Sequence, residues 1–277
     1  MPLNSVITNS GAQVALASFN RTVEDLSATQ KRISTGYRVA DAKDDGAAYA
    51  VAERVRGEVA ANTSANEQLG GAKGLLDVTS ASLQNVSSTL QKLQSVAVKL
   101  ADGTITSEQR TQYQSQAKEL TNNIKSFIKD ATYNGKNVLA DPSSLTNQVV
   151  RNGAGETYSF SGYSALANIF NGVSAANTWS RSDASAALTS TGAIGKAITN
   201  TLTELNNFGS YSNFVDSQIN YNKAKIDAQE TGLGALVDAD LAKESAKLQS
   251  LQIRQQLGTQ ALSIANQAPQ TLLSLFR

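Results

Sequence analysis

The sequence predicts a mainly α-helical fold, an elongated antiparallel helical bundle or coiled coil with a small β-hairpin region at its tip. Three observations lead to this prediction. Apolar residues recur every three or four positions through most of the chain, which is the period of a helix with one buried face. This pattern reaches both ends. It fails between about residues 137 and 192, where polar and apolar residues alternate around a glycine-rich turn.

The most regular helical pattern covers residues 69–100. Steps of three and four alternate there as in a coiled-coil seam, at Leu69, Ala72, Leu76, Thr79, Leu83, Val86, Leu90, Leu93, Ala97 and Leu100. Asp102-Gly103 ends this helix, and the capping sequence Thr106-Ser107-Glu108 begins the next. The second helix places one apolar face at Tyr113, Ala117, Leu120, Ile124, Phe127 and Ala131, and Tyr133-Asn134-Gly135 ends it.

A third helical pattern runs from near Ile194 to about Val237, with Gly209-Ser210 as a candidate kink. Polar residues fill several seam positions, namely Thr201, Ser212, Asn222 and Gln229. Polar seam residues lower stability but fix the register and the partner of a coiled coil. We therefore expect this helix to pack against the two preceding ones in a single defined register.

Residues 148–151 and 156–160 flank Asn152-Gly153-Ala154-Gly155 and are predicted to form a β-hairpin. We expect residues 161–192 to be irregular surface structure that contains Trp179. The enrichment of Ser and Thr over residues 143–192 favours a solvated loop. The alternative is O-glycosylation of an exposed face, with candidate acceptors Ser143, Ser144, Ser180, Ser182 and Thr189.

Both ends of the chain are predicted to be amphipathic helices without a partner nearby in sequence. The N-terminal seam is Leu16, Phe19, Val23, Leu26 and Ile33, with Gln30 as a polar interruption. The C-terminal helix has a broader apolar face, at Leu241, Leu248, Leu251, Ile253, Leu257, Leu262 and Ile264. An amphipathic helix must bury its apolar stripe. The two ends are therefore expected to pair with each other or with further copies of the chain, as in a filament subunit.

Composition argues against an enzyme. The chain has no His and no Cys, so the commonest general base and the thiolate nucleophile are absent, as are disulfides and zinc fingers. The balance of 24 Lys+Arg against 23 Asp+Glu gives no basic footprint for nucleic acid. No signal peptide and no apolar run of roughly 20 residues is visible. Export would therefore need a route that does not depend on a signal peptide.

The acidic cluster of Asp41, Asp44 and Asp45 raises the question of a metal site. A calcium loop needs oxygen ligands at its third and twelfth positions, where this chain has Lys43 and Ala52. We therefore interpret the cluster as a connector between helices, in which Asp44-Asp45-Gly46 caps the next helix. Arg32, Lys43 and neighbouring subunits are expected to pair with the carboxylates.

Five segments resemble a known family. Residues 32–47, RISTGYRVADAKDDGA, are similar to the "RLSSGLRINSAKDDAAG" signature of bacterial flagellins, and residues 132–139, TYNGKNVL, resemble the flagellin "TxFNGxxLL" segment. Residues 238–244, 252–262 and 265–277 resemble "VEDADYAxE", "QILQQAGTSVL" and "ANQxPQxxLSLLR" of the same family. The segments occur in family order, and the resemblance covers roughly residues 1–140 and 190–277.

The resemblance implies a short flagellin without large outer domains. Residues 1–36 and 238–277 would form a terminal coiled-coil inner domain, 37–50 a spoke-like connector, 51–140 and 190–237 a helical rod, and 141–189 a β-hairpin and irregular surface-exposed cap. The expected function is that of a filament subunit, in a helical tube that transmits motor torque, exported by the flagellar type III system. No enzymatic activity and no cofactor are implied. The expected self-assembly interface comprises Leu16, Phe19, Val23, Leu26, Ile33, Asp41, Asp44, Asp45, Leu248, Ile253, Leu257, Leu262 and Ile264.

The implied partners are further copies of the chain, sibling flagellins, an export chaperone, the filament cap and hook-associated proteins, with no nucleic acid and no membrane. A Toll-like receptor recognises many flagellins, but here Lys92 and Asn123 replace an Arg and an acidic residue of the usual contact site, which weakens that interface. A hook–filament junction protein remains an alternative, since it shares the terminal plan. A flagellin carrying a zinc protease would need HExxH, which a chain without His lacks. A generic coiled-coil binding module would not explain the paired terminal segments.

Overall fold

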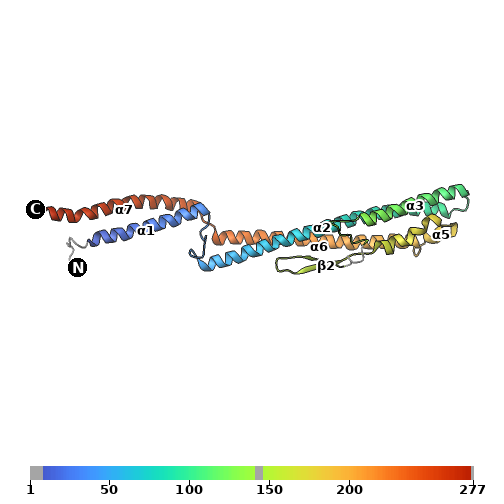
Figure 1. Cartoon of the computed structure of the whole chain (residues 1–277), viewed down its shortest axis with the longest axis horizontal. Coiled ribbons are helices and arrows are strands. Elements are labelled where there is room, and N and C mark those ends of the chain that lie inside the picture. The colour runs from blue at the N-terminus through green and yellow to red at the C-terminus, as the bar shows by residue number, and fades with distance from the viewer. Residues whose placement is uncertain (1–8, 141–145, 276–277) are drawn as a thin grey trace. The chain divides into compact units, whose positions relative to one another are not determined.

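A computed structural model describes residues 9–140 and 146–275. The chain divides into two compact units, one formed by Met1–Gly57 with Ala228–Arg277 and the other by Glu58–Asp227. The elements in chain order (Figure 1) are α1 (Ser10–Thr35), α2 (Gly46–Ala101), α3 (Ser107–Asp130), β1 (Thr146–Val150), β2 (Thr157–Ser161), a π-helical turn (Leu166–Phe170), α4 (Asn171–Val173), a 3₁₀ turn (Ser174–Thr178), α5 (Arg181–Ala187), α6 (Ala193–Val237) and α7 (Leu241–Leu275). The predicted mainly helical fold with one antiparallel hairpin is confirmed.

The core of the 58–227 unit follows the predicted seam of α2. All ten seam residues of α2 are buried except Ala72, which is half-buried. The facing residues are Ala117, Ile124 and Ile128 of α3 and, from α6, Ile194, Ala197, Thr201, Phe208 and Val215. Helices packed along their length form a narrow core. Leu, Ile and Ala side chains can fill such a core, whereas a wider core would need more aromatic residues.

Local signals set the ends of α3. Thr106 and Gln109 form a capping box, in which each side chain accepts a hydrogen bond from the other residue's backbone N–H. At the other end, the Asn137 amide donates to the carbonyls of Ile128 and Lys129, at 2.8 and 3.0 Å. These bonds satisfy carbonyls that the helix end leaves free. The predicted end of α3 is therefore confirmed.

The hairpin has the expected antiparallel pairing, from Thr146 opposite Ser161 to Val150 opposite Thr157. The ring of Tyr158 stacks on Phe214 of α6 with centroids 4.0 Å apart. This contact buries one face of the hairpin against the long helices.

The expectation of irregular surface structure for residues 161–192 is wrong. The segment forms a run of short helical turns, and Ile169, Val173, Ala176, Ala184 and Ala187 of this run lie in the core together with Trp179. Each turn is too short to show a helical period, which explains why the sequence pattern failed. α6 continues through Gly209-Ser210, the candidate kink, as one unbroken helix.

The other unit contains an antiparallel pair of α1 and α7, which lie side by side (Figure 1). Asn9 Nδ2 donates to the carbonyl of Ala265 at 2.6 Å, whereas Arg32, near the other end of α1, pairs with Glu244 at 3.4 Å. The predicted pairing of the two chain ends is thus confirmed within one subunit. A second small core of this unit consists of Val39, Ala48, Ala52 and Val237.

Candidate assembly surface on the terminal helices

Local capping sets both ends of α1 and the start of α7. The Asn9 side chain accepts a hydrogen bond from Ala12 N–H at 3.0 Å, and Gly36 ends α1 at φ 75° with its N–H donating to the Arg32 carbonyl. Asp240 caps α7 by accepting from Lys243 N–H at 3.1 Å. The sequence therefore places capping residues at both ends of α1 and at the start of α7.

The seam between α1 and α7 differs from the predicted one. Its least exposed positions on α1 are Ala12, Ala15, Phe19, Thr22, Leu26, Thr29, Arg32 and Ile33, and on α7 they are Glu244, Leu248, Leu251, Gln255, Gly258, Leu262 and Ala265. Leu16 and Val23, predicted on the seam, lie outside it, and so does Gln30. Ala15, Thr22 and Thr29, each one position earlier, take their places. The other predicted seam residues of α1, Phe19, Leu26 and Ile33, do lie on the seam.

A set of large apolar residues remains exposed on the same two helices. We call five of them the outer stripe, because on a helical period Leu16 and Val23 share one face of α1, and Ile253, Leu257 and Ile264 share one face of α7. Val14 and Leu241 are exposed on other sides of these helices. Of the residues predicted for assembly, the structure exposes Leu16, Val23, Ile253, Leu257 and Ile264, and it leaves Phe19, Leu26, Ile33, Leu248 and Leu262 half-buried in the seam. An exposed apolar face on a helix is typical of an interaction surface.

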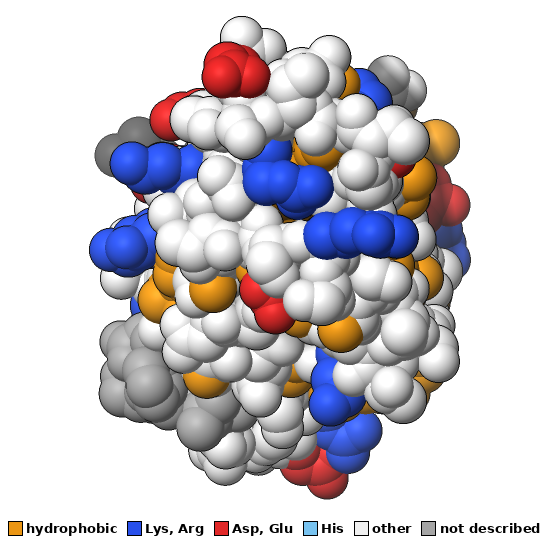
Figure 2. Space-filling model, turned by 90° about the vertical axis from the view of Figure 1, so that its right-hand side faces the viewer, with side chains coloured by type: hydrophobic (Ala, Val, Ile, Leu, Met, Phe, Trp, Pro, Cys, Tyr) orange, Lys and Arg blue, Asp and Glu red, His pale blue; other side chains and the backbone are white. Residues whose placement is uncertain are grey.

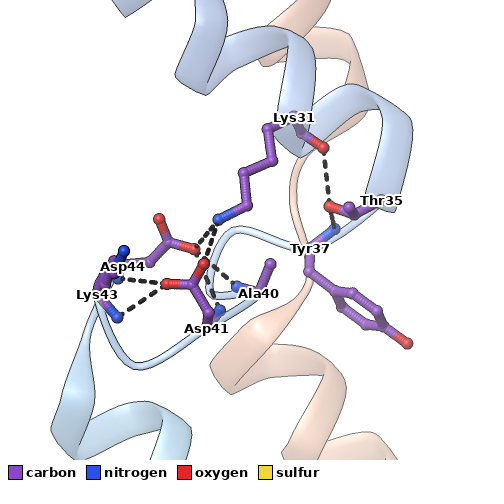
Figure 3. Close-up of polar contacts among 7 residues, drawn as sticks. All are labelled: Lys31, Thr35, Tyr37, Ala40, Asp41, Lys43 and Asp44. Atoms are coloured by element: carbon purple, nitrogen blue, oxygen red, sulfur yellow. Dashed lines mark hydrogen bonds and ion pairs between the residues drawn. The ribbon is translucent and has the colours of Figure 1, made fainter. Parts of the chain in front are cut away.

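The connector between α1 and α2 is held by one lysine (Figure 3). Lys31 Nζ contacts Asp41 Oδ2 at 2.7 Å and Asp44 Oδ2 at 3.1 Å. Asp44 Oδ2 also accepts from Ala40 N–H at 3.0 Å, and Asp41 Oδ1 accepts from Lys43 N–H at 2.8 Å. The loop thus folds back over the last turns of α1.

This arrangement corrects the predicted partners of the acidic cluster. Arg32 pairs with Glu244 of α7, and Lys43 contacts Asp41 through its backbone. Sequence reasoning missed Lys31 because only the return of the loop brings it near residues ten and thirteen positions later. The predicted cap is confirmed for Asp45, whose Oδ1 accepts from the N–H groups of Ala47 and Ala48 at 3.1 and 3.0 Å.

The ion pairs shift the titration of all three side chains. The hydrogen bond from Lys31 is the main cause that lowers the pKa of Asp41, followed by the N–H of Lys43. Lys31 is likewise the main cause that lowers the pKa of Asp44, followed by the N–H of Ala40. In return, Asp41 and then Asp44 raise the pKa of Lys31. Because these groups are exposed, salt weakens the interaction.

The connector is also paired with the segment that joins α6 to α7. The N–H groups of Arg38 and Val39 donate to the Val237 carbonyl at 2.7 and 3.3 Å, and Ala239 N–H donates to the Gly36 carbonyl at 2.9 Å. The side chain of Val39 is buried in the small core. The α1–α2 connector and the segment between α6 and α7 therefore hold each other in place.

The candidate glycosylation residues lie in different settings. Ser182 is exposed at the start of α5. Ser180 caps α5 and accepts from Asp183 N–H, and the exposed Thr189 donates to the Ala186 carbonyl at 2.9 Å. Ser143 and Ser144 lie outside the described residues. Figure 2 shows a face on which uncharged polar groups and backbone predominate, with charged and hydrophobic side chains scattered among them.

None of the described helices combines the length and the hydropathy needed to cross a membrane.

Residues 6–144 match the bacterial flagellin N-terminal helical region, and residues 191–276 match the bacterial flagellin C-terminal helical region. The chain is 36% identical to Flagellin FljK of Caulobacter vibrioides over 100% of both chains, and 33% identical to a Flagellin of Brucella melitensis over 99% of both.

Two solved structures share the fold. The crystal structure of Bacillus cereus flagellin superposes with a TM-score of 0.50 at 18% identity, over 56% of this chain and 88% of that one. A putative flagellar hook-associated protein from Vibrio parahaemolyticus gives a TM-score of 0.58 at 16% identity, over 70% of this chain and 100% of that one. Such low identities show similarity of fold alone.

Proposed function

Because this chain belongs to the bacterial flagellin family and is a subunit of a flagellar filament, we propose that its outer stripe is the surface by which one subunit binds the next. A hook–filament junction role is not favoured, since the full-length relatives at 33–36% identity are named flagellins. The hook-associated structure shares the fold at only 16% identity.

The proposal rests on one observation: the seam between α1 and α7 is already buried within one subunit, while the outer stripe of the same helices is exposed. Leu251 is 4% exposed in the seam of the isolated subunit, whereas Leu257, six residues later on the same helix, is 58% exposed. Full burial of one such side chain contributes about 1.5–3 kcal/mol. Burial of several stripe residues between copies would therefore favour a polymer strongly, without rearranging the helix pair.

We further propose roles for the connector, the domains and the partners of the chain. Asp41, Asp44 and Asp45 would lie near the junction between copies, in a spoke-like connector spanning residues 37–50. The terminal domain would comprise residues 1–36 and 238–277, and the rod 51–140 and 190–237. We propose export by the flagellar type III system, an extracellular location, and contacts with an export chaperone, sibling flagellins, the filament cap and hook-associated proteins. Toll-like receptor recognition would be weak, as Lys92 and Asn123 indicate.

Leu257→Asp tests the proposed surface. The exposed position of Leu257 predicts that the variant keeps the melting temperature and helicity of the wild-type subunit but does not polymerise, because a charge must then be desolvated between copies. Ser182→Asp is the control, since it places the same charge on an exposed residue of α5. Negative-stain microscopy of seeded samples gives the readout. Normal filaments from Leu257→Asp would contradict the proposal, as would failure of both variants to assemble.

Glycosylation of Ser180, Ser182 or Thr189 is a separate proposal that rests on their exposure. Intact-mass measurement of filaments sheared from cells tests it. A mass equal to that of the bare chain would contradict it.

A further inference from the structure

Three Asn-Gly pairs occur in the described residues, at Asn134-Gly135, Asn152-Gly153 and Asn171-Gly172. An Asn side chain followed by Gly is prone to lose its amide, because the Gly nitrogen has no neighbouring Cβ to hinder its attack. We propose that Asn134 is a site of spontaneous deamidation in the native protein, and that the fold protects Asn152 and Asn171.

The chemistry needs water and no further reactant. The backbone nitrogen of Gly135 attacks Cγ of Asn134, a C–N bond forms, and the side-chain nitrogen leaves as ammonia. Water then opens the resulting five-membered imide at one of its two carbonyls. Opening at the side-chain carbonyl gives aspartate, and opening at the backbone carbonyl gives isoaspartate, in which the main chain gains one methylene.

The setting of Asn134 leaves this reaction unhindered. Asn134 and Gly135 are both exposed, and both have positive φ, 48° and 74°, in a two-residue turn closed by mutual bonds between Tyr133 and Lys136. Within the described part of the chain, neither the Asn134 amide nor the Gly135 N–H has a hydrogen-bond partner. Asn134 also lines an open pocket of about 190 Å³ beside α2. The reaction therefore breaks no hydrogen bond of the attacking nitrogen or of the amide.

The other two pairs are held. Asn152 Oδ1 accepts from the N–H groups of Ala154 and Glu156, both at 3.1 Å, and its amide donates to the Glu156 carboxylate. The attacking nitrogen, Gly153 N–H, donates to Asn62 Oδ1 at 2.9 Å. Asn171 lies in helical backbone, φ −59° and ψ −33°, where ring closure would require the helix to open. Breaking several hydrogen bonds slows the reaction at Asn152 at least about tenfold.

The modification would alter the contact between this turn and α2. The ring of Tyr133 lies over Gly74, so closely that a Cβ at position 74 would come within 2.7 Å of it. Isoaspartate lengthens the turn and so disrupts the bonds between Tyr133 and Lys136 that hold the ring there. Aspartate instead adds a negative charge two residues from Lys136.

Peptide mapping of the full-length protein tests the proposal. Samples aged in mildly alkaline buffer are digested with trypsin; residues 130–136 form one peptide, and fragment ions separate Asn152 from Asn171 in the peptide 152–181. Conversion at Asn134 should exceed that at the other two sites at least about tenfold in the native protein, and the three rates should converge in urea. Comparable native rates at all three sites, or a native Asn134 that stays intact while it converts in urea, would overturn the proposal.

Asn62→Ala provides a second test. This variant removes the acceptor of Gly153 N–H, and it leaves the turn at Asn134 unchanged. It should accelerate deamidation at Asn152 and leave the rate at Asn134 unaltered. An unchanged rate at Asn152 in the folded variant would show that the hydrogen bond from Gly153 N–H to Asn62 does not protect this pair.

Discussion

The ring of Phe19 in α1 packs directly against Gly258 in α7. A Cβ placed on Gly258 would lie 3.1 Å from Cδ2 of Phe19, which is closer than ordinary van der Waals contact. The absence of a side chain at residue 258 thus makes room for the largest residue of the seam. This relationship fixes the two helices in one register, because a slip along either helix would set the ring against a residue with a side chain.

We predict that Gly258→Leu weakens the pairing of α1 and α7 by about 1–3 kcal/mol, through overpacking against Phe19. Gly209→Ala is the matched control, since a Cβ there meets nothing within 4 Å inside α6. It should stabilise the chain by about 0.5–1 kcal/mol, through higher helix propensity. Thermal melts followed by circular dichroism give both values. A Gly258→Leu protein as stable as the wild type would show that Phe19 can move aside.

The sequence was sufficient to predict the long helices, but it did not predict which side chains each of them contacts. The regular Leu spacing of α2 predicted the core, and the Asn-Gly turn predicted the hairpin, because both signals span a full structural period. Thr29 is fully buried in the α1–α7 seam, and nothing in its residue type indicates this. The pairing of Lys31 with Asp41 depends on the path of a loop. The spacing of apolar residues carries no information about that path.

The connector should lose stability at both extremes of pH. The lowered pKa values of Asp41 and Asp44 stabilise the folded connector above the unfolded value of about 3.9, and this contribution is lost as pH falls through the folded values. The raised pKa of Lys31 stabilises below its unfolded value of about 10.4, and this contribution is lost as pH rises through the folded value. Without His, no ordinary side chain titrates between pH 6 and 7.

If the connector lies at the junction between copies, filaments should disassemble in acid before the α2–α3–α6 core loses helicity. Light scattering and circular dichroism, followed together as pH falls, separate the two events. Lys31→Met should move the acid midpoint of disassembly towards neutral pH. Lys43→Met should leave it in place, because Lys43 contacts Asp41 through its backbone. Loss of helicity at a higher pH than loss of scattering would rule the junction out.

Deleting residues 240–277 should abolish polymerisation and leave a folded monomer. The 58–227 unit has its own core, from Leu69 of α2 to Val215 of α6, and this core contains no residue of α7. The deletion removes the partner of α1 and most of the outer stripe. Sedimentation should show a monomer, and circular dichroism a cooperative melt. Filaments formed by the shortened chain would contradict the assignment of assembly to the terminal helices.

The last prediction concerns Asn222, a fully buried polar residue of α6. Its amide donates to Asn66 Oδ1 at 3.0 Å and to the Arg151 carbonyl at 2.8 Å, so it ties the hairpin turn to both α2 and α6. Asn222→Ala leaves these half-buried acceptors without their donor, and each fully buried group of this kind would cost about 1–3 kcal/mol. Asn220→Ala, at an exposed position of the same helix, should change stability by no more than about 0.5 kcal/mol.

Urea unfolding of the two variants measures the difference, and hydrogen exchange of the hairpin amides locates it. Protection should fall first at the amides of β1 and β2 in Asn222→Ala, because the hairpin depends on this contact while the leucine seam of α2 does not. The slope of the unfolding curve should remain that of the wild type, since the core stays intact. Equal stability of the two variants would mean that water replaces the lost donor. Uniform loss of protection across α2, α3 and α6 would instead make Asn222 part of the helical core, with no separate role in holding the hairpin.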